Sequence, residues 1–182
     1  MDARDDRFRR GTIRAARPED APAIGIVHVR SWQAAYRGHF PQEFLDALDP
    51  ARRAEGWRAY LEGGMGRNES LLVCEIKDQI VGFAYTGPCR DGQGGGELRA
   101  IYLLPQDWGH GHGHELAASA LEELALQGFT EAMLWVLEEN LRARAFYEAG
   151  GWRRDGGSRV IEPFGFPIPE LRYRISLDMP RP

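Results

Sequence analysis

The chain has 182 residues, of which 43% are hydrophobic and 27% are charged, a length and balance that favour one globular domain and exclude a membrane bundle. Its formal net charge of −4 excludes the broadly basic surface that is typical of nucleic-acid binding. The two cysteines, Cys74 and Cys89, form neither a disulfide framework nor a metal-ligand pattern, which favours a reducing compartment.

The N-terminal segment, residues 1–11, is polar and highly charged. We expect it to be a flexible arm ahead of a single domain that covers residues 12–179. The arm lacks the apolar centre of a signal peptide, and no later apolar stretch is long enough to span a membrane. We therefore expect a cytoplasmic protein with no membrane partner.

The first half of the chain changes from helical to strand periodicity. Its predicted elements are a strand over 12–16, a long helix over 18–36, helical segments after 41 and around 52–61, and strands over 70–76 and 79–86. The last two strands are separated only by Lys77-Asp78, the spacing of a tight hairpin, although the Asp-Gln pair that follows is a weak hairpin-turn signal.

The second half alternates strands with helices. Its predicted elements are a glycine-rich loop at 92–96, a strand over 97–104, a loop over 105–113, a helix ending at 128, a strand over 131–137, a short helix after 140, and closing strands over 159–162 and 170–177. A hairpin-rich first half joined to a strand–helix–strand crossover predicts an α/β (α+β) fold, with a mixed sheet covered by helices on both faces.

The most informative loop is Trp108-Gly109-His110-Gly111-His112-Gly113-His114, between a predicted strand and a predicted helix. Glycine at every second position permits positive φ angles and removes side chains that would block a ligand. The helix that follows offers its free amides and its positive dipole end to an anion. The segment therefore predicts a phosphate-binding loop.

Two common phosphate loops do not match this spacing. A nucleotide P-loop ends in Gly-Lys-Ser/Thr, and Lys77 lies elsewhere in the chain. A dinucleotide fingerprint would need its third glycine at position 114, where the chain has His114. A nucleotide-binding protein is therefore a weaker interpretation of this loop.

Four blocks of the sequence together resemble the GCN5-related N-acetyltransferases, the GNAT superfamily. These blocks are Glu97-Leu98-Arg99-Ala100-Ile101-Tyr102-Leu103-Leu104-Pro105, the glycine loop, Leu134 to Asn140, and Arg142 to Tyr147 with Gly151-Trp152. Their order and spacing match from about Ser70 to Trp152. The resemblance implies a mostly antiparallel central sheet of about six or seven strands. It also implies that the strands at 97–104 and 131–137 splay apart to form a cleft.

The same resemblance implies acetyl-CoA as co-substrate, bound in that cleft. By its pattern, backbone at Tyr102 and Leu103 contacts the pantetheine arm, and the loop amides hold the diphosphate. Asn140 and Tyr147 correspond to residues that reach the arm and the sulfur. The loop positions concerned are Trp108, Gly109, His110, Gly111, His112, Gly113 and His114. This chain departs from the family in having Trp108 where Gln or Arg is usual, and His112 where Ile or Val is usual.

Two residues are candidates for acid–base catalysis. Glu97 lies eleven residues before Trp108, the spacing of the catalytic carboxylate in histone-type relatives. It can take the proton of the attacking amine, unless it is simply a surface carboxylate at a strand end. Tyr147 can protonate the departing thiolate, although packing with Phe146 would also account for it. Asn140 can serve as both a helix cap and a cofactor ligand.

The resemblance also implies that the region of the first helix contacts the acceptor. Trp32 and Tyr36 are candidates for substrate binding, with core packing as the alternative for Trp32. Phe164-Gly165-Phe166-Pro167 is a candidate lid. The alternating histidines of the glycine loop are a poor metal site, and no metal is expected.

The sequence therefore predicts an enzyme that transfers an acetyl group directly from acetyl-CoA to a primary amine, in a small molecule or a peptide. The alternative is a non-catalytic acyl-CoA-binding or regulatory module of the same fold. The resemblance is also compatible with a homodimer. The acidic net charge gives no reason to expect a nucleic-acid partner.

Overall fold

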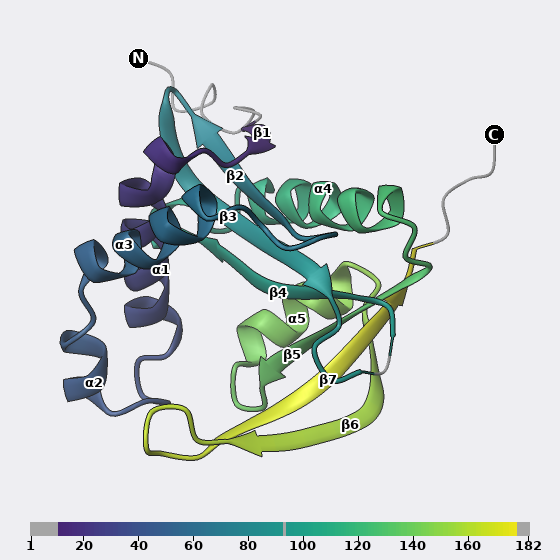
Figure 1. Ribbon diagram of the computed structural model, residues 1–182. Helices are drawn as coiled ribbons and strands as arrows, with labels where there is room; N and C mark the ends of the chain where they lie inside the picture. The colour runs from purple at the N-terminus through teal and green to yellow at the C-terminus, as the bar shows by residue number, and fades with distance from the viewer. Residues whose placement is uncertain (1–10, 93, 178–182) are drawn as a thin grey trace, which may run out of the picture.

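The computed structural model of the protein describes residues 11–92 and 94–177 (Figure 1). The expected arm at 1–11 lies almost wholly outside the described residues, as do the last residues of the expected domain at 12–179. The strands are β1 (Thr12–Ala15), β2 (Ser70–Ile76), β3 (Gln79–Pro88), β4 (Gly96–Leu103), β5 (Glu131–Leu137), β6 (Arg153–Ile161) and β7 (Ile168–Ser176). The helices are α1 (Ala21–Ala35), α2 (Gln42–Asp46), α3 (Pro50–Glu62), α4 (His112–Leu126) and α5 (Leu141–Ala149), with 3-10 turns η2 (Pro18–Asp20) and η3 (Pro105–Asp107).

All the described strands belong to one sheet in the order β1-β2-β3-β4-β5-β7-β6. Only β4 and β5 are parallel, and their register contains just two pairs, Gly96 with Ala132 and Glu97 with Met133. Both pairs lie at the N-terminal ends of the strands, so β4 and β5 separate towards their C-terminal ends. The expected mixed, mostly antiparallel sheet with a splayed strand pair is confirmed. The opening faces the segments that lead into α4 and α5.

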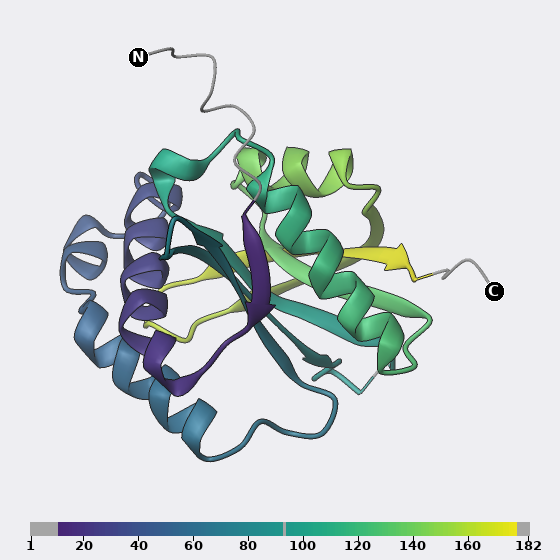
Figure 2. The ribbon, with the colours of Figure 1, turned by 90° about the horizontal axis from the view of Figure 1, so that it is seen from above.

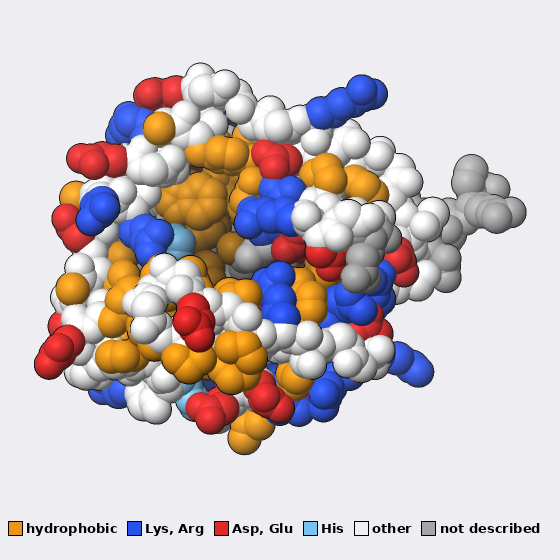
Figure 3. Space-filling model, turned by 60° about the horizontal axis from the view of Figure 1, so that its bottom comes forward, with side chains coloured by type: hydrophobic (Ala, Val, Ile, Leu, Met, Phe, Trp, Pro, Cys, Tyr) orange, Lys and Arg blue, Asp and Glu red, His pale blue; other side chains and the backbone are white. Residues whose placement is uncertain are grey.

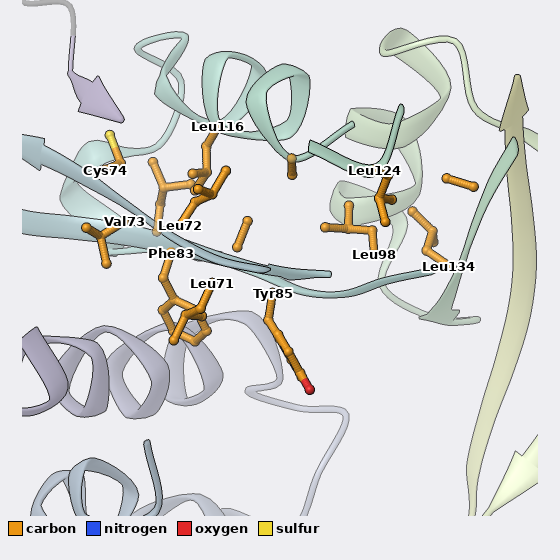
Figure 4. Close-up of a cluster of buried hydrophobic side chains, with 14 of the residues drawn as sticks. Leu71, Leu72, Val73, Cys74, Phe83, Tyr85, Leu98, Leu116, Leu124 and Leu134 are labelled. Carbon is orange, nitrogen blue, oxygen red and sulfur yellow. The ribbon is translucent and has the colours of Figure 1, made fainter. Parts of the chain in front are cut away.

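Helices cover both faces of the sheet, with α1, α2 and α3 on one side and α4 and α5 on the other (Figure 2). Alternate strand residues fill the two layers, because successive side chains of a strand point to opposite faces. Leu71 and Phe83 point towards α1, whereas Leu72 and Cys74 point towards α4 (Figure 4). No helix in the described part of the chain has the length and apolar character needed to cross a membrane.

Helix α3 packs closely across α1 at Gly25. A Cβ atom at this position would lie 2.4 Å from the carbonyl oxygen of Pro50, so only glycine permits the contact. The contact holds the α2–α3 segment against α1. The three helices therefore form a wall beside the opening between β4 and β5.

Element types agree with those predicted, and the differences lie at element ends. The hairpin turn has positive φ at both Lys77 (50°) and Asp78 (61°), as a primed turn requires. Helix α4 begins at His112, inside the segment expected to be loop. Strand β6 begins at Arg153, well before the expected 159. The first residues of β6 are exposed and mostly polar, and the pairing with β7 is irregular between Arg154 and Ser158. The sequence there has no alternation of apolar and polar residues from which a strand could be predicted.

Candidate functional site

Three neighbouring cavities lie around the opening between β4 and β5. The loop cleft, about 780 Å³, lies between the glycine loop and α5. The inner cavity, about 290 Å³, shares Ile101, Tyr102 and Tyr147 with the loop cleft and extends to the other face of the sheet. The aromatic hollow, about 620 Å³, lies between α1, α2 and α3 and meets the inner cavity at Phe164.

The glycine loop presents a row of free backbone amides to the loop cleft. Gly109 and Gly111 have φ angles of +80° and +93°, which turn the chain into the first turn of α4. No backbone carbonyl among the described residues accepts a hydrogen bond from the N–H groups of residues 109–113. These donors, together with the positive end of α4, form an anion site that suits a diphosphate.

The edge of β4 also faces the opening with unpaired backbone groups. The N–H of Leu104 donates to Val81 O, so strand alternation turns the polar groups of Leu103 and Ile101 away from β3. The Leu103 carbonyl accepts hydrogen bonds from Ser31 Oγ (2.6 Å) and Trp108 Nε1 (2.9 Å). The Leu103 N–H and the Ile101 groups therefore remain for an extended ligand.

Tyr147 and Asn140 lie at the opposite wall, on and before α5. Asn140 is buried, lines the inner cavity, and caps α5 by accepting the Ala143 N–H at 3.0 Å. Tyr147 lines both the loop cleft and the inner cavity. Burial raises the pKa of its hydroxyl, so the group is a neutral proton donor at physiological pH.

Trp32 and Tyr36, the expected acceptor contacts, both line the inner cavity. Their rings meet edge to face at 5.2 Å between centroids. Burial raises the pKa values of Tyr36 and Tyr102, and the charge of Glu170 raises both further. Glu170 is the only acidic residue among the described residues that line this cavity, and its Oε2 atom accepts a hydrogen bond from Arg159 Nε at 2.7 Å. The sequence did not indicate a role for Glu170, because this residue lies far along the chain from the motif and from the tyrosines that it approaches in the fold.

The three loop histidines differ in position. His114 lines the loop cleft and packs on Phe146 at 4.7 Å, whereas the side chains of His110 and His112 line none of the three cavities. His112 is buried, with its Nδ1 atom 3.7 Å from Glu115 Oε2. No group of three or more residues of the metal-binding types gathers anywhere in the described residues.

The structure does not bring Glu97 together with Tyr147. Glu97 is buried at the start of β4 and lines none of the three cavities. Its Oε2 atom accepts the backbone N–H of Arg90 at 3.1 Å and lies 3.8 Å from Arg99 Nε. The base role expected for Glu97 stays a prediction, and these contacts do not favour it.

Arg142 is a further cleft residue to which the sequence attached no role. It lines both the loop cleft and the inner cavity, and its Cζ atom lies 3.2 Å from the centroid of the Trp108 ring. No described acidic residue forms an ion pair with it. The guanidinium therefore reaches from α5 to the loop at Trp108, the position where the resemblance implies Gln or Arg.

Comparisons with known proteins identify relatives of this architecture. The family model described as the Acetyltransferase (GNAT) family matches residues 29–152. An uncharacterized N-acetyltransferase of Bacillus subtilis, YuaI, is 35% identical over 140 residues, which cover 76% of this chain and 78% of the relative.

Two solved structures have a similar fold. One is the PaiA N-acetyltransferase of Thermoplasma acidophilum in complex with coenzyme A. It has a TM-score of 0.67 at 18% sequence identity, and the match covers 91% of this chain and 98% of the PaiA chain. The putative acetyltransferase YncA of Salmonella typhimurium was solved with acetyl-CoA. It has a TM-score of 0.66 at 18% sequence identity, and the match covers 94% of this chain and 96% of the YncA chain.

Proposed function

Because this chain belongs to the GNAT acetyltransferase family, we propose that it transfers an acetyl group from acetyl-CoA directly to a primary amine. The observation that carries the proposal is the opening between β4 and β5, which has free loop amides on one side and the Tyr147 hydroxyl on the other. Both features suit a long ligand with a diphosphate at one end and a reactive carbonyl at the other.

The residues of the cleft fit such a ligand along its whole length. The amides of 109–113 would hold the diphosphate, with Arg142 supplying a side-chain charge beside them. The free groups of Ile101 and Leu103 would pair with the amides of the pantetheine arm, as an added strand would. Ser31 and Trp108 would hold the Leu103 carbonyl in place.

Acetyl-CoA supplies a thioester whose carbonyl carbon accepts the amine. Tyr147 would donate its proton to the departing sulfur, since burial keeps the hydroxyl protonated. Glu170, in the wall of the inner cavity, would bind the incoming ammonium and accept its proton directly or through water. Positioning of the two substrates in one cleft would supply the larger part of the acceleration.

The test is thiol release from acetyl-CoA in the presence of a panel of primary amines, together with calorimetric titration of CoA. We expect CoA to bind and at least one amine to release thiol above the hydrolysis rate. Binding without release from any amine would favour the non-catalytic acyl-CoA-binding module. Failure of CoA to bind would overturn both interpretations.

A further inference from the structure

The aromatic hollow is not used by the acetyl donor in the proposed reaction. Figure 3 shows a hollow on the face of the molecule turned to the viewer, with a hydrophobic floor and with Arg and His side chains at its edge. The apolar part of the lining comes mainly from Phe44, Trp57, Tyr60, Tyr85 and Phe164. Its volume, about 620 Å³, exceeds what an aromatic amino acid needs.

Arg53 lines the aromatic hollow and lies over Trp32, a residue of the inner cavity. Its Cζ atom lies 5.6 Å from the centroid of the Trp32 ring, and its charge lowers the pKa of His28. It forms no ion pair with any described residue. Asp49, the only acidic residue among the described residues of the lining, caps α3 by accepting the Ala51 N–H at 2.8 Å. The lining therefore has two guanidinium groups, those of Arg52 and Arg53, and one carboxylate, which leaves positive charge in excess.

His28 adds a second donor without an acceptor. Its Nδ1 atom accepts the indole N–H of Trp57 at 3.2 Å, which places the ring proton on Nε2. That nitrogen is buried and has no hydrogen-bond partner in the described part of the chain. Burial, with the charge of Arg53, lowers the pKa of His28 to about 3, so the ring is neutral. His28 Nε2 and the Arg53 guanidinium are therefore both N–H donors, and the other polar side chains of the lining are those of Asp49, Arg52, Tyr60 and Tyr85.

These donors lie one aromatic layer from the reacting end of the cleft. The His28 ring stacks on Tyr102 at 5.2 Å with an interplanar angle of 17°, and Tyr102 lines both the inner cavity and the loop cleft. Trp32, under Arg53, also lines the inner cavity. The charges of Arg53 and Glu170 both act on the Tyr102 hydroxyl, so a small molecule bound beside Tyr102 would lie between a cation and an anion.

We propose that the acceptor amine carries a carboxylate and an apolar or aromatic body, and that Arg53 holds this carboxylate at the inner edge of the aromatic hollow. An arginine fork matches the two oxygens of a carboxylate, and the aromatic lining of the hollow suits an apolar body. The amine would face Glu170, the one carboxylate among the described residues of the inner cavity lining. The ammonium of a zwitterion would thus meet Glu170, and its carboxylate would meet Arg53. The proposal rests on the proposed acetyl transfer.

The experiment compares matched amines that differ only in the carboxylate. L-phenylalanine, L-tyrosine and L-methionine are each assayed against phenethylamine, tyramine and 3-(methylthio)propylamine, by thiol release from acetyl-CoA. Arg53→Met and Arg53→Lys are tested beside Arg58→Met, an exposed arginine of the same helix. The ratio of kcat/KM between the members of a pair is an internal standard, which partial misfolding would leave unchanged.

We expect the wild type to prefer at least one amino acid, and Arg53→Met to lower that preference roughly 10- to 100-fold. Arg53→Lys should restore part of it, and Arg58→Met should leave it unchanged. Equal or better turnover of the decarboxylated amines, a ratio unaltered in Arg53→Met, or failure of all the amino acids by an enzyme that binds CoA would overturn the carboxylate assignment. Failure to bind CoA would instead overturn the proposed function.

Discussion

The guanidinium of Arg142 stacks on the indole of Trp108, with Cζ 3.2 Å from the ring centroid, and links α5 to the glycine loop across the cleft. The loop itself has no lysine or arginine, and Arg142 is the only one of either type among the described residues that line the loop cleft. We predict that Arg142→Met weakens CoA binding roughly 10- to 100-fold, because a charge-assisted contact is lost. Calorimetric titration at two salt concentrations measures both the affinity and the salt dependence that this charge contributes.

Two further variants separate charge from stacking at this position. Arg142→Lys keeps the charge and should retain part of the affinity, whereas Trp108→Leu removes the platform and one hydrogen bond to Leu103 O. An unchanged CoA dissociation constant in Arg142→Met, with an unchanged salt slope, would contradict a phosphate contact.

Tyr147→Phe tests the proposed proton donor with little change in packing. Tyr147 lines the loop cleft and the inner cavity, and burial raises the pKa of its hydroxyl, so the group remains protonated through neutral and mildly alkaline pH. We predict a fall in kcat on the order of 10²-fold, with acetyl-CoA affinity nearly unchanged. Stopped-flow thiol release and calorimetry measure the two quantities separately. Unaltered turnover would assign Tyr147 to packing alone.

The glycine loop was predictable because its chemistry is local. Gly111 and the start of α4 are neighbours in the sequence, so the loop, its amides and the helix dipole all follow from one short segment. The splay of β4 from β5 was predictable only through the family resemblance, since no residue pattern marks where two strands stop pairing. The exposed first half of β6 carried no alternation and could not be recognised.

The side chains that complete the site come from distant segments. Glu170 lies on β7 and reaches the inner cavity because the sheet order places β7 next to β5. Arg53 lies on α3 and reaches the aromatic hollow beside Trp32 because α3 packs on α1. Glu97 has the expected spacing from the loop, but spacing along the chain does not determine which groups contact its carboxylate in the fold. Arg90 and Arg99 surround it here.

The pH dependence of kcat/KM distinguishes Glu170 from Glu97 as the base. A carboxylate base works only when ionised, so kcat/KM should show an acidic limb that depends on the residue acting as base. We predict that Glu170→Gln lowers kcat/KM on the order of 10²-fold and removes this acidic limb, whereas Glu97→Gln keeps it.

The matched control is Arg159→Gln, which breaks the 2.7 Å ion pair of Arg159 with Glu170 but leaves the carboxylate in place. It should keep the acidic limb. The reverse outcome, with the limb lost in Glu97→Gln and kept in Glu170→Gln, would return the base role to Glu97.

A polar network beside the aromatic hollow links stability to pH. Glu69 accepts hydrogen bonds from Tyr60, Tyr85, Arg99 and the Gly66 N–H. Burial alone would raise the pKa of Glu69, but the hydrogen bonds from Tyr60 and Arg99 outweigh it and lower the pKa to about 2. A carboxylate whose pKa is lower in the folded state stabilises the fold above its unfolded pKa, about 4.3. That contribution is lost as the pH falls towards 2.

Glu69→Gln should therefore lower the free energy of unfolding by on the order of 2 kcal/mol at neutral pH. The difference from wild type should narrow steadily below about pH 4, because the wild-type carboxylate then takes up its proton. Urea unfolding at a series of pH values measures this difference. Glu62→Gln, at an exposed carboxylate of α3, is the matched control and should follow the wild type throughout. If the difference in the free energy of unfolding between wild type and Glu69→Gln stayed constant with pH, the stabilisation would come from packing and neutral hydrogen bonds and not from the charge of Glu69.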